Sequence, residues 1–468
     1  MIMTESSSMI YKSTRGKARE LGFKDVIFEG LASDGGLYVP SSWPVLDSKL
    51  IESFSDMSYQ EIAYHVFKPY LDETISEDTL KEIIHHSYKN FTNNEITPLR
   101  KINNNEYLLE LFHGPTYAFK DIAMQFISRI MDYYLTRDNS HINILGATSG
   151  DTGSAAIYGF ENIKSSNVFI LHPYNLISPT QRKFMTTINS ENIINIAVKG
   201  NFDDCQNIIK EIFSDEEYKK SNNLGAINSI NWARIMCQIT YYFYSASRIK
   251  DNENIIYSVP TGNFGDILAG YISKKMGLKF KKLNIATNEN NILDRTLRSG
   301  DHSIKGVIST TSPSIDIQIS SNFERLLFDL LDMSPRVVEK KMSELKESGK
   351  FELSKSELES FKNNFDAGSL DQDETVKIIK DIYNRSHQII DPHTAIAVGV
   401  HYKNSYKNSI VLSTAHAAKF PDTVMKAIGI NPELPNISED IYKLHENIID
   451  LPNDVGDINA FITKNFSE

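Results

Sequence analysis

Lys120 stands where a loop rich in Gly, Pro and Thr becomes an apolar helix, in the stretch HGPTYAFKDIAMQF (113–126). A lysine in this position could be an ordinary solvated side chain. It could also be a nucleophile, because partial shielding from water leaves a fraction of the amine unprotonated and reactive. The residues around Lys120 are compatible with both interpretations.

Two glycine-rich turns could hold an anionic ligand. GATSGDTG (146–153) and PTGNFGD (260–266) each lie between a strand-like and a helix-like stretch. Glycine lets the backbone approach a ligand closely, and the start of a helix offers unpaired N–H groups with partial positive charge. Either turn alone could be a tight strand-to-helix connection, and the second lacks the Walker and dinucleotide spacings. Together with Lys120 they predict an anion site at the C-terminal ends of strands.

The stretch NSINWARI (228–235) is a third candidate for anion binding. Ser229 and Asn231 offer neutral donors, and Arg234 offers a planar, permanently charged fork. The alternative is a helix start in which Ser229 or Asn231 is the cap and Arg234 lies on the surface.

A late stretch, STAHAAKFPD (413–422), ends a predicted strand and contains His416 and Lys419. His416 could be a general base or a zinc ligand, but no second histidine has ligand spacing and no metal site is expected. The chain also lacks the G-x-S-x-G turn of a nucleophilic serine, so hydrolase chemistry has little support.

The elements that must position these residues alternate between short apolar runs and helical patterns from residue 98 onward, which is typical of an α/β architecture. The expected strands are 105–112, 142–145, 255–259 and 409–414, and the expected helices are 121–135, 154–160 and 267–276. Residues 1–97 form an opening module, in which SYQE (58–61) predicts a helix with a capping box. The Lys/Glu-rich stretch 334–364 predicts a solvated helical surface.

Composition excludes several classes of protein. Among 468 residues, 49 are Lys or Arg and 60 are Asp or Glu, and this net charge of −11 argues against a nucleic-acid partner. No apolar run is long enough to span a membrane. With two cysteines and no apolar leader at the start, we expect a cytoplasmic protein without disulfides.

Taken together, the motifs resemble the threonine synthase family in its longer form, which carries an extra N-terminal module. The similarity covers nearly the whole chain, and LFHGPTYAFKD and SSNFER are its most specific pieces. The matching stretches are YKSTRG (11–16), LASDGGLYVP (31–40), LFHGPTYAFKD (111–121), TSGDTGSAA (148–156), NSINWARI (228–235), TGNFGD (261–266), SPSIDIQISSNFERLL (312–327) and TAHAAKF (414–420).

This resemblance implies a cofactor, pyridoxal 5′-phosphate, bound to Lys120 as a Schiff base. Thr414 would offer a hydroxyl to the pyridine nitrogen. Asp151 stands near the 3′-oxygen of the cofactor, where many relatives have Asn, which puts the usual hydrogen-bond assignment there in doubt. The turn that holds the cofactor phosphate would comprise Gly262, Asn263, Phe264, Gly265 and Asp266.

The resemblance also assigns residues to the substrate. Ser149 and Thr152 would receive the carboxylate of the amino acid. The substrate phosphate would be held by Ser229, Asn231 and Arg234, with Lys419 as a second positive charge.

The fold implied is that of a two-lobed fold-type II pyridoxal-phosphate enzyme, similar to the β subunit of tryptophan synthase, with parallel-type sheets flanked by helices. We expect an N-terminal module (1–97), a catalytic core (98–430) and a C-terminal segment packed on the core (431–468). Within the core, the smaller lobe covers roughly 115–225 and the larger lobe covers the remainder.

The reaction implied converts O-phospho-L-homoserine and water into L-threonine and phosphate by β,γ-elimination and replacement, the last step of threonine biosynthesis. Such an enzyme is a carbon–oxygen lyase acting on phosphates, and it would work as a monomer or homodimer. One alternative is a related phospho-lyase that releases a keto acid. A more distant alternative is a non-catalytic ligand-binding protein with the same fold.

Overall fold

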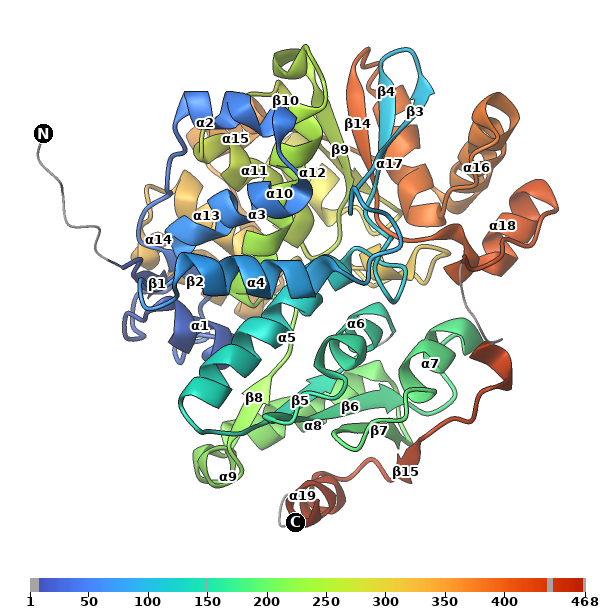
Figure 1. Cartoon of the computed structure of the whole chain (residues 1–468). Helices are drawn as coiled ribbons and strands as arrows, with labels where there is room; N and C mark the ends of the chain where they lie inside the picture. Colours follow the sequence, from blue (N-terminus) through green and yellow to red (C-terminus); the bar gives the residue numbers. More distant parts are fainter. Residues whose placement is uncertain (1–7, 149, 436–440, 466–468) are drawn as a thin grey trace, which may run out of the picture.

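A computed structural model describes residues 8–148, 150–435 and 441–465. Two sheets form the centres of two lobes, one above the other in Figure 1. In the larger sheet only β3 runs antiparallel to its neighbour; the other paired strands are parallel. Its strand order is β13 (Phe365–Ser369), β10 (Lys282–Thr287), β9 (Ile256–Pro260), β14 (Ser409–Ser413), β4 (Glu106–Glu110) and β3 (Leu99–Asn103).

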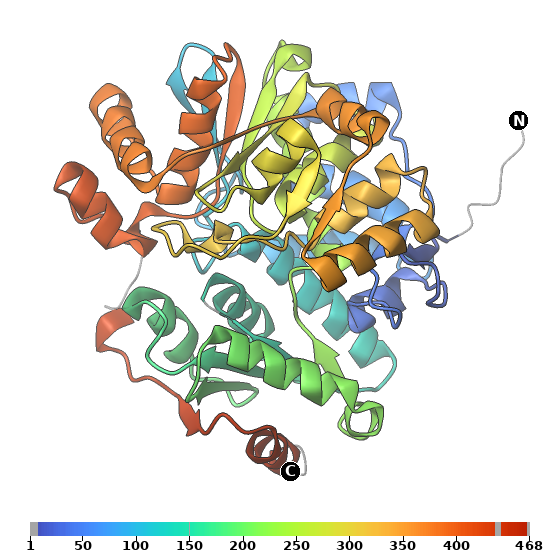
Figure 2. The ribbon, with the colours of Figure 1, turned by 180° about the vertical axis from the view of Figure 1, so that it is seen from behind.

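The smaller sheet is parallel throughout. Its strand order is β15 (Ile449–Leu451), β7 (Ile193–Val198), β6 (Ser166–Pro173), β5 (Ile142–Ala147) and β8 (Leu224–Ala226). Helix α8 (Phe202–Ser214) lies across one face and α6 (Asp151–Phe160) across the other, as the opposite views of Figures 1 and 2 show. Because both faces are covered, β5 reads as an almost continuous apolar run. The expected fold class, with two lobes and parallel-type sheets, is confirmed.

The N-terminal region packs tightly onto the larger lobe. Its apolar side chains belong to the same hydrophobic cluster as those of the central helices. Ser58 and Glu61 form the expected capping box. The elements of this region are β1 (Tyr11–Ser13), α1 (Phe23–Glu29), β2 (Tyr38–Pro40), α2 (Ser48–Ser53), α3 (Tyr59–Phe67) and α4 (Glu77–Tyr88).

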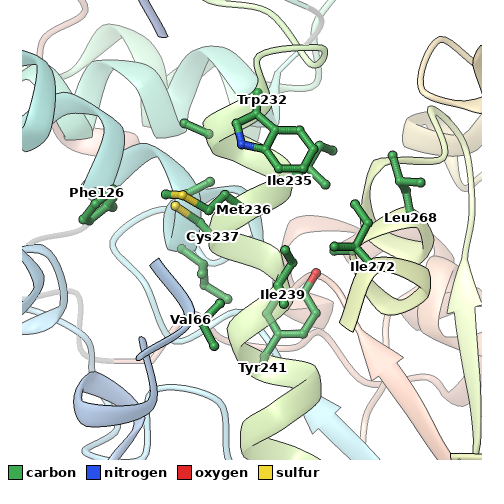
Figure 3. Packing of buried hydrophobic residues seen from close by; sticks show 14 of the residues in the cluster. Val66, Phe126, Trp232, Ile235, Met236, Cys237, Ile239, Tyr241, Leu268 and Ile272 are labelled. Atoms are coloured by element: carbon green, nitrogen blue, oxygen red, sulfur yellow. The ribbon is translucent and has the colours of Figure 1, made fainter. Parts of the chain in front are cut away.

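Helix α10 (Trp232–Ser247) is the centre of this core, and its residues from Trp232 to Ala246 are all buried. Figure 3 shows its side chains meeting Val66 of α3, Phe126 of α5 (Lys120–Arg137) and Leu268 of α11 (Gly265–Lys275). Neighbours therefore surround α10 from its first turn onward, and Arg234 lies in that turn.

The stretch 334–364 differs in one respect from the expected helical surface. Strand β12 (Lys350–Glu352) separates α14 (Pro335–Ser348) from α15 (Lys355–Asn364), because Gly349 has a positive φ of 72° and ends α14. Phe351 is then buried, although charged residues surround it.

The remaining elements complete the two lobes. The other helices are α7 (Pro179–Thr186), α9 (Glu216–Ser221), α12 (Ile292–Ser299), α13 (Phe323–Leu330), α16 (Gln372–Ser386), α17 (Pro392–Lys403), α18 (Pro421–Ile428) and α19 (Val455–Lys464), and the other strand is β11 (Asp301–Ser303). The short 3₁₀ helices are η1 (Phe54–Asp56), η2 (Lys68–Tyr70), η3 (Asn252–Asn254), η4 (Pro313–Ile315), η5 (Ala417–Lys419) and η6 (Ile441–Lys443). In the described part of the chain, none of the helices is both long enough and apolar enough to cross a membrane.

Candidate active site

Lys120 is the first residue of α5, and its side chain is only 12% exposed. The loop before it is fixed to the end of β14, because the Phe119 N–H donates to the Thr414 carbonyl at 2.9 Å. Burial lowers the pKa of the Lys120 amine; Asp151 opposes this shift, whereas Arg234 adds to it. A buried amine with a lowered pKa is the chemical setting that a nucleophilic lysine requires.

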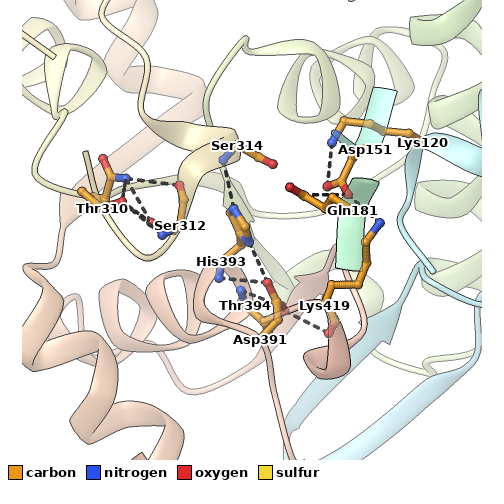
Figure 4. Close-up of polar contacts among 12 residues, drawn as sticks. Lys120, Asp151, Gln181, Thr310, Ser312, Ser314, Asp391, His393, Thr394 and Lys419 are labelled. Carbon is orange, nitrogen blue, oxygen red and sulfur yellow. Dashed lines mark hydrogen bonds and ion pairs between the residues drawn. The ribbon is translucent and has the colours of Figure 1, made fainter. Parts of the chain in front are cut away.

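Asp151 lies between two lysines, as Figure 4 shows. Its Oδ2 is 3.4 Å from Lys120 Nζ, and its Oδ1 is 2.5 Å from Lys419 Nζ. Burial alone would raise the pKa of Asp151, but Lys419 and Lys120 together hold it well below the usual range. Lys419 also donates to the Thr116 carbonyl at 2.9 Å. These contacts form a compact row of alternating charges.

The turn between β9 and α11 forms a cradle of backbone groups. Phe264 adopts the left-handed conformation (φ 64°) just before α11 begins, which is a strained geometry for a non-glycine residue. Gly262 is required by the close packing here, since a Cβ atom would lie 2.7 Å from the Ser314 carbonyl oxygen. The N–H groups at the start of α11 are thus available at the turn, as phosphate binding requires.

Asp266 follows this turn and is buried. Its Oδ1 accepts hydrogen bonds from the hydroxyls of Tyr241 and Tyr242, whereas Oδ2 has no hydrogen-bond partner among the described residues. Burial raises the pKa of Asp266 to about 7. The carboxyl group is therefore partly protonated near neutral pH.

Arg234 is buried without a carboxylate partner in the part of the chain that the structure describes. Its Nη1 donates to the Asn228 carbonyl at 3.3 Å, and burial lowers its pKa to about 10. A guanidinium has five N–H donors. Arg234 consequently has donors left for an anion, and it lines the same cleft as Lys120.

The cleft, with about 660 Å³ of space including its open mouth, brings most of the expected site residues together. Of the residues expected in the site, it is lined by Lys120, Thr152, Ser229, Arg234, Gly262, Asn263, Phe264, Gly265, Asp266 and Thr414. Asp151 and Lys419 are not among the residues that line it, but Asp151 pairs with both Lys120 and Lys419. Ser149 is outside the described residues.

Asn231 is not among the residues that line the cleft. It is the N-cap of α10: its Oδ1 accepts from the Ala233 N–H at 3.0 Å. Its Nδ2 donates to the Ile27 carbonyl at 2.8 Å. The capping alternative considered for Asn231 therefore holds, and its side chain is engaged on both sides.

Four further residues of the cleft wall did not follow from sequence reasoning: Gln238, Ser314, Asn322 and His393. His393 Nδ1 lies 2.7 Å from Asp391 Oδ2, and its Nε2 accepts from the Ser314 N–H at 3.2 Å. An Asp-x-His spacing in DPHT (391–394) was the available signal for this pair. Asn322 belongs to SSNFER, a stretch that the sequence marked as specific without giving it a function.

These residues fit a ligand that has a carbonyl group and a phosphate. Lys120 offers an amine to the carbonyl, and the turn before α11 offers backbone donors and a helix N-terminus to the phosphate. Arg234 is a cation for a second anionic group.

Family models match most of the chain in three parts. Residues 10–88 match the model described as "Threonine synthase N terminus", and residues 91–347 match "Pyridoxal-phosphate dependent enzyme". Residues 394–462 match "Threonine synthase, C-terminal".

Relatives and solved structures agree with these matches. The threonine synthase of Pseudomonas aeruginosa is 43% identical over 97% of this chain and 98% of its own, and that of Saccharomyces cerevisiae is 45% identical over 91% and 90%. A crystal structure of threonine synthase from Brucella melitensis with bound pyridoxal phosphate superposes with a TM-score of 0.95, at 43% identity over 98% of this chain and 100% of that one. The chain thus has the fold and the cofactor expected from its motifs.

Proposed function

Since this chain belongs to the threonine synthase family of pyridoxal-phosphate-dependent enzymes, we propose that it converts O-phospho-L-homoserine and water into L-threonine and phosphate. This makes it a carbon–oxygen lyase acting on phosphates, at the last step of threonine biosynthesis. The observation that carries the proposal is Arg234, a buried guanidinium without a carboxylate partner in the described chain, in the same cleft as Lys120. A phosphorylated amino acid provides the anion that Arg234 lacks.

Three parts of the chain would hold the cofactor. Lys120 would bind it covalently through Nζ, and residues 262–266 would surround its phosphate with backbone donors. Thr414 would present its hydroxyl to the ring nitrogen. Pyridoxal 5′-phosphate, when bound, supplies an electron sink for negative charge that develops on the substrate.

Lys120 would also move protons during the reaction. Its lowered pKa leaves a larger fraction of the amine unprotonated at neutral pH, so that it can accept a proton from the Cα atom of the substrate. Asp151 stays ionised beside it because Lys419 is 2.5 Å away. In this arrangement the negative charge of Asp151 stabilises the protonated Lys120 amine, and Lys120 can give the proton back to the substrate.

The substrate would be bound at both of its ends. Thr152, with Ser149, would receive the carboxylate near the start of α6. Arg234 and Ser229 would bind the phosphate through charge-assisted and hydroxyl hydrogen bonds. Asn231 would hold their loop in place through Ile27, and Lys419 would add positive charge to the cleft without leaving Asp151.

We also propose the division of the chain given above, with a module (1–97), a core (98–430) and a C-terminal segment (431–468). Support for the first boundary comes from the family models, one of which ends at residue 88 while the next begins at residue 91. As a biosynthetic enzyme it would work in the cytoplasm, as a monomer or homodimer.

One assay tests the proposed reaction. Purified protein with bound cofactor is incubated with O-phospho-L-homoserine, and threonine, inorganic phosphate and keto acids are measured in the same sample. Equal amounts of threonine and phosphate are expected. Phosphate together with a keto acid would instead indicate the phospho-lyase, and no phosphate release would contradict both.

A further inference from the structure

Asn322 joins two loops that are far apart in sequence. It is fully buried, and its Nδ2 donates to the Asn263 carbonyl at 3.0 Å and to the Ser229 carbonyl at 3.3 Å. Its backbone N–H also donates to the Asn263 carbonyl, at 3.0 Å. Asn263 belongs to the proposed cofactor-phosphate turn and Ser229 to the proposed substrate-phosphate loop. One amide group therefore connects the two anion-binding loops.

Arg325 fixes the side chain of Asn322 by a hydrogen bond. It is 1% exposed, and its Nη1 donates to Asn322 Oδ1. Nη2 donates to the Ile230 carbonyl at 2.7 Å, in the substrate-phosphate loop, and Nε donates to the Tyr38 carbonyl at 3.0 Å, in strand β2. All three guanidinium nitrogens thus bond to neutral oxygens. Unlike the Arg234 guanidinium, that of Arg325 already donates a hydrogen bond to the protein from each of its three nitrogens.

The N-terminal region contacts the same loop a second time. Asn231, which lies between Ser229 and Arg234 in the chain, donates from Nδ2 to the Ile27 carbonyl. Arg325 and Asn231 together anchor loop 228–231 to β2 and to α1. Contacts with β2, with α1 and with the Asn322–Arg325 pair consequently determine the position of this loop relative to the cofactor turn.

We propose that Asn322 and Arg325 are positioning residues that fix the distance between the cofactor-phosphate turn and loop 228–231, and that this distance selects a substrate with its phosphate on Cγ. This inference rests on the proposed function. A substrate bound at the cofactor places its phosphate at a distance set by the length of its carbon chain. If the loop is held at a fixed distance, a phosphate one methylene nearer cannot reach Ser229 and Arg234 equally well.

The test compares binding of two phosphonates that cannot lose phosphate. L-2-Amino-5-phosphonopentanoate has the chain length of O-phospho-L-homoserine, and L-2-amino-4-phosphonobutanoate is one methylene shorter. Each is titrated into the holoenzyme, and the dissociation constant is taken from the change in cofactor absorbance. We expect the wild type to prefer the longer compound by roughly 10- to 200-fold, the discrimination that one methylene commonly gives.

Three variants separate positioning from general stability. Asn322→Ala removes the connection between the loops, and Arg325→Lys keeps a buried cation but loses the fork geometry. Glu324→Gln is the matched control on the same helix as Arg325. It weakens the contacts of Glu324 with Thr14 and Arg15, and among the described residues the Glu324 side chain has no hydrogen bond to either loop. Melting temperatures are measured for all three variants.

We expect the preference for the longer phosphonate to fall to about threefold or less in Asn322→Ala and Arg325→Lys, and to stay near the wild-type value in Glu324→Gln. An unchanged preference in Asn322→Ala would overturn the proposal, even if Arg325→Lys did not fold. An equal loss of preference in Glu324→Gln would also overturn it, because stability alone would then explain the effect. The proposed function fails separately, if the wild type forms no threonine, and the binding preference remains measurable in that case.

Discussion

The two sides of the cleft bury charge in opposite ways. On the first, Lys120, Asp151 and Lys419 alternate in sign, with N–O distances of 3.4 and 2.5 Å. On the second, Arg234 has no carboxylate partner and Asp266 has a carboxylate oxygen without a hydrogen bond, in both cases among the described residues. Burial accordingly lowers the pKa of Arg234 to about 10 and raises that of Asp266 to about 7.

The two sides therefore differ in whether a buried charge has an oppositely charged partner within the described part of the protein. A buried ion pair becomes costly when one partner is removed, because the other is left uncompensated. A buried charge without a partner already destabilises the free protein, and a bound anion offsets that cost. The first side should therefore respond to mutation through stability and proton transfer, whereas Arg234 on the second side should respond through ligand affinity.

The largest expected effect concerns Lys120. Lys120→Ala should lower kcat by about 10²- to 10⁴-fold or more, since a positioned acid–base group commonly contributes this much. Borohydride reduction should fix cofactor to the Lys120 peptide in the wild type and to no peptide in the variant, as read by mass spectrometry. Labelling of Lys419 in the wild type would show that the two amines have been assigned wrongly.

The next effect concerns the ion pair of Lys419. Lys419→Met should destabilise the cofactor-free protein by about 3–5 kcal/mol in urea unfolding, because Asp151 loses its nearer cation. The double variant Lys419→Met/Asp151→Asn should recover most of this loss, because no unpaired carboxylate remains. A single-variant cost below about 1 kcal/mol would mean that Lys120 alone compensates Asp151.

The third prediction concerns pH and Asp266. Its pKa in the folded protein, about 7, is above the ordinary value of 3.8, so the folded state binds more protons between those pH values. The free energy of unfolding therefore falls as pH rises through this window, and the deficit persists above pH 7. Asp266→Asn should lack this decrease.

Relative to wild type, the variant should gain on the order of 4 kcal/mol between about pH 4 and 7, with no further gain above. Unfolding of the cofactor-free proteins at several pH values provides the measurement, and Asp294→Asn, a buried carboxylate on α12, is a control away from the cleft. Parallel pH curves for wild type and Asp266→Asn would contradict the raised pKa.

The smallest expected effect, and the sharpest test of the comparison, concerns Arg234. Arg234→Met should raise the KM for O-phospho-L-homoserine by about ten- to a hundredfold, the equivalent of roughly 1.5–3 kcal/mol for a charge-assisted contact. Part of the loss should appear in kcat, because the same charge stabilises the departing phosphate. Stability of the cofactor-free protein should be unchanged or slightly higher, in contrast to Lys419→Met. A large loss of stability with normal KM would make Arg234 a structural residue.

Local patterns allowed much of the fold to be predicted. The strands at 106–110, 142–147 and 256–260 match the expected ones because each contains a short run of buried, mainly apolar residues. The helix that begins at Lys120 and the capping box at Ser58 also follow from residues close in sequence. The family resemblance supplied the cofactor, which the relatives confirm; the individual roles of the site residues remain predictions.

Contacts over long sequence distances could not be predicted in this way. Arg325 and Tyr38 are 287 positions apart, and Lys419 and Thr116 are 303 apart. Asn231 has the residue type of both a cap and a phosphate ligand, and only the approach of Ile27 shows that its amide is engaged. His393 and Asn322 were missed for the same reason: single polar residues gain a function only from what the folded chain brings next to them.

The place of β15 at the edge of the smaller sheet has a consequence for biosynthesis. β15 pairs with β7, yet Leu451 is made 253 residues after its partner Val198. At about 5–20 residues per second, a ribosome needs roughly 13–50 seconds to cover this stretch. Throughout that interval the nascent chain presents the outer edge of β7 without its final partner, a surface on which strands of other chains can add. Chaperone protection of the growing polypeptide should therefore matter most after the first half of translation.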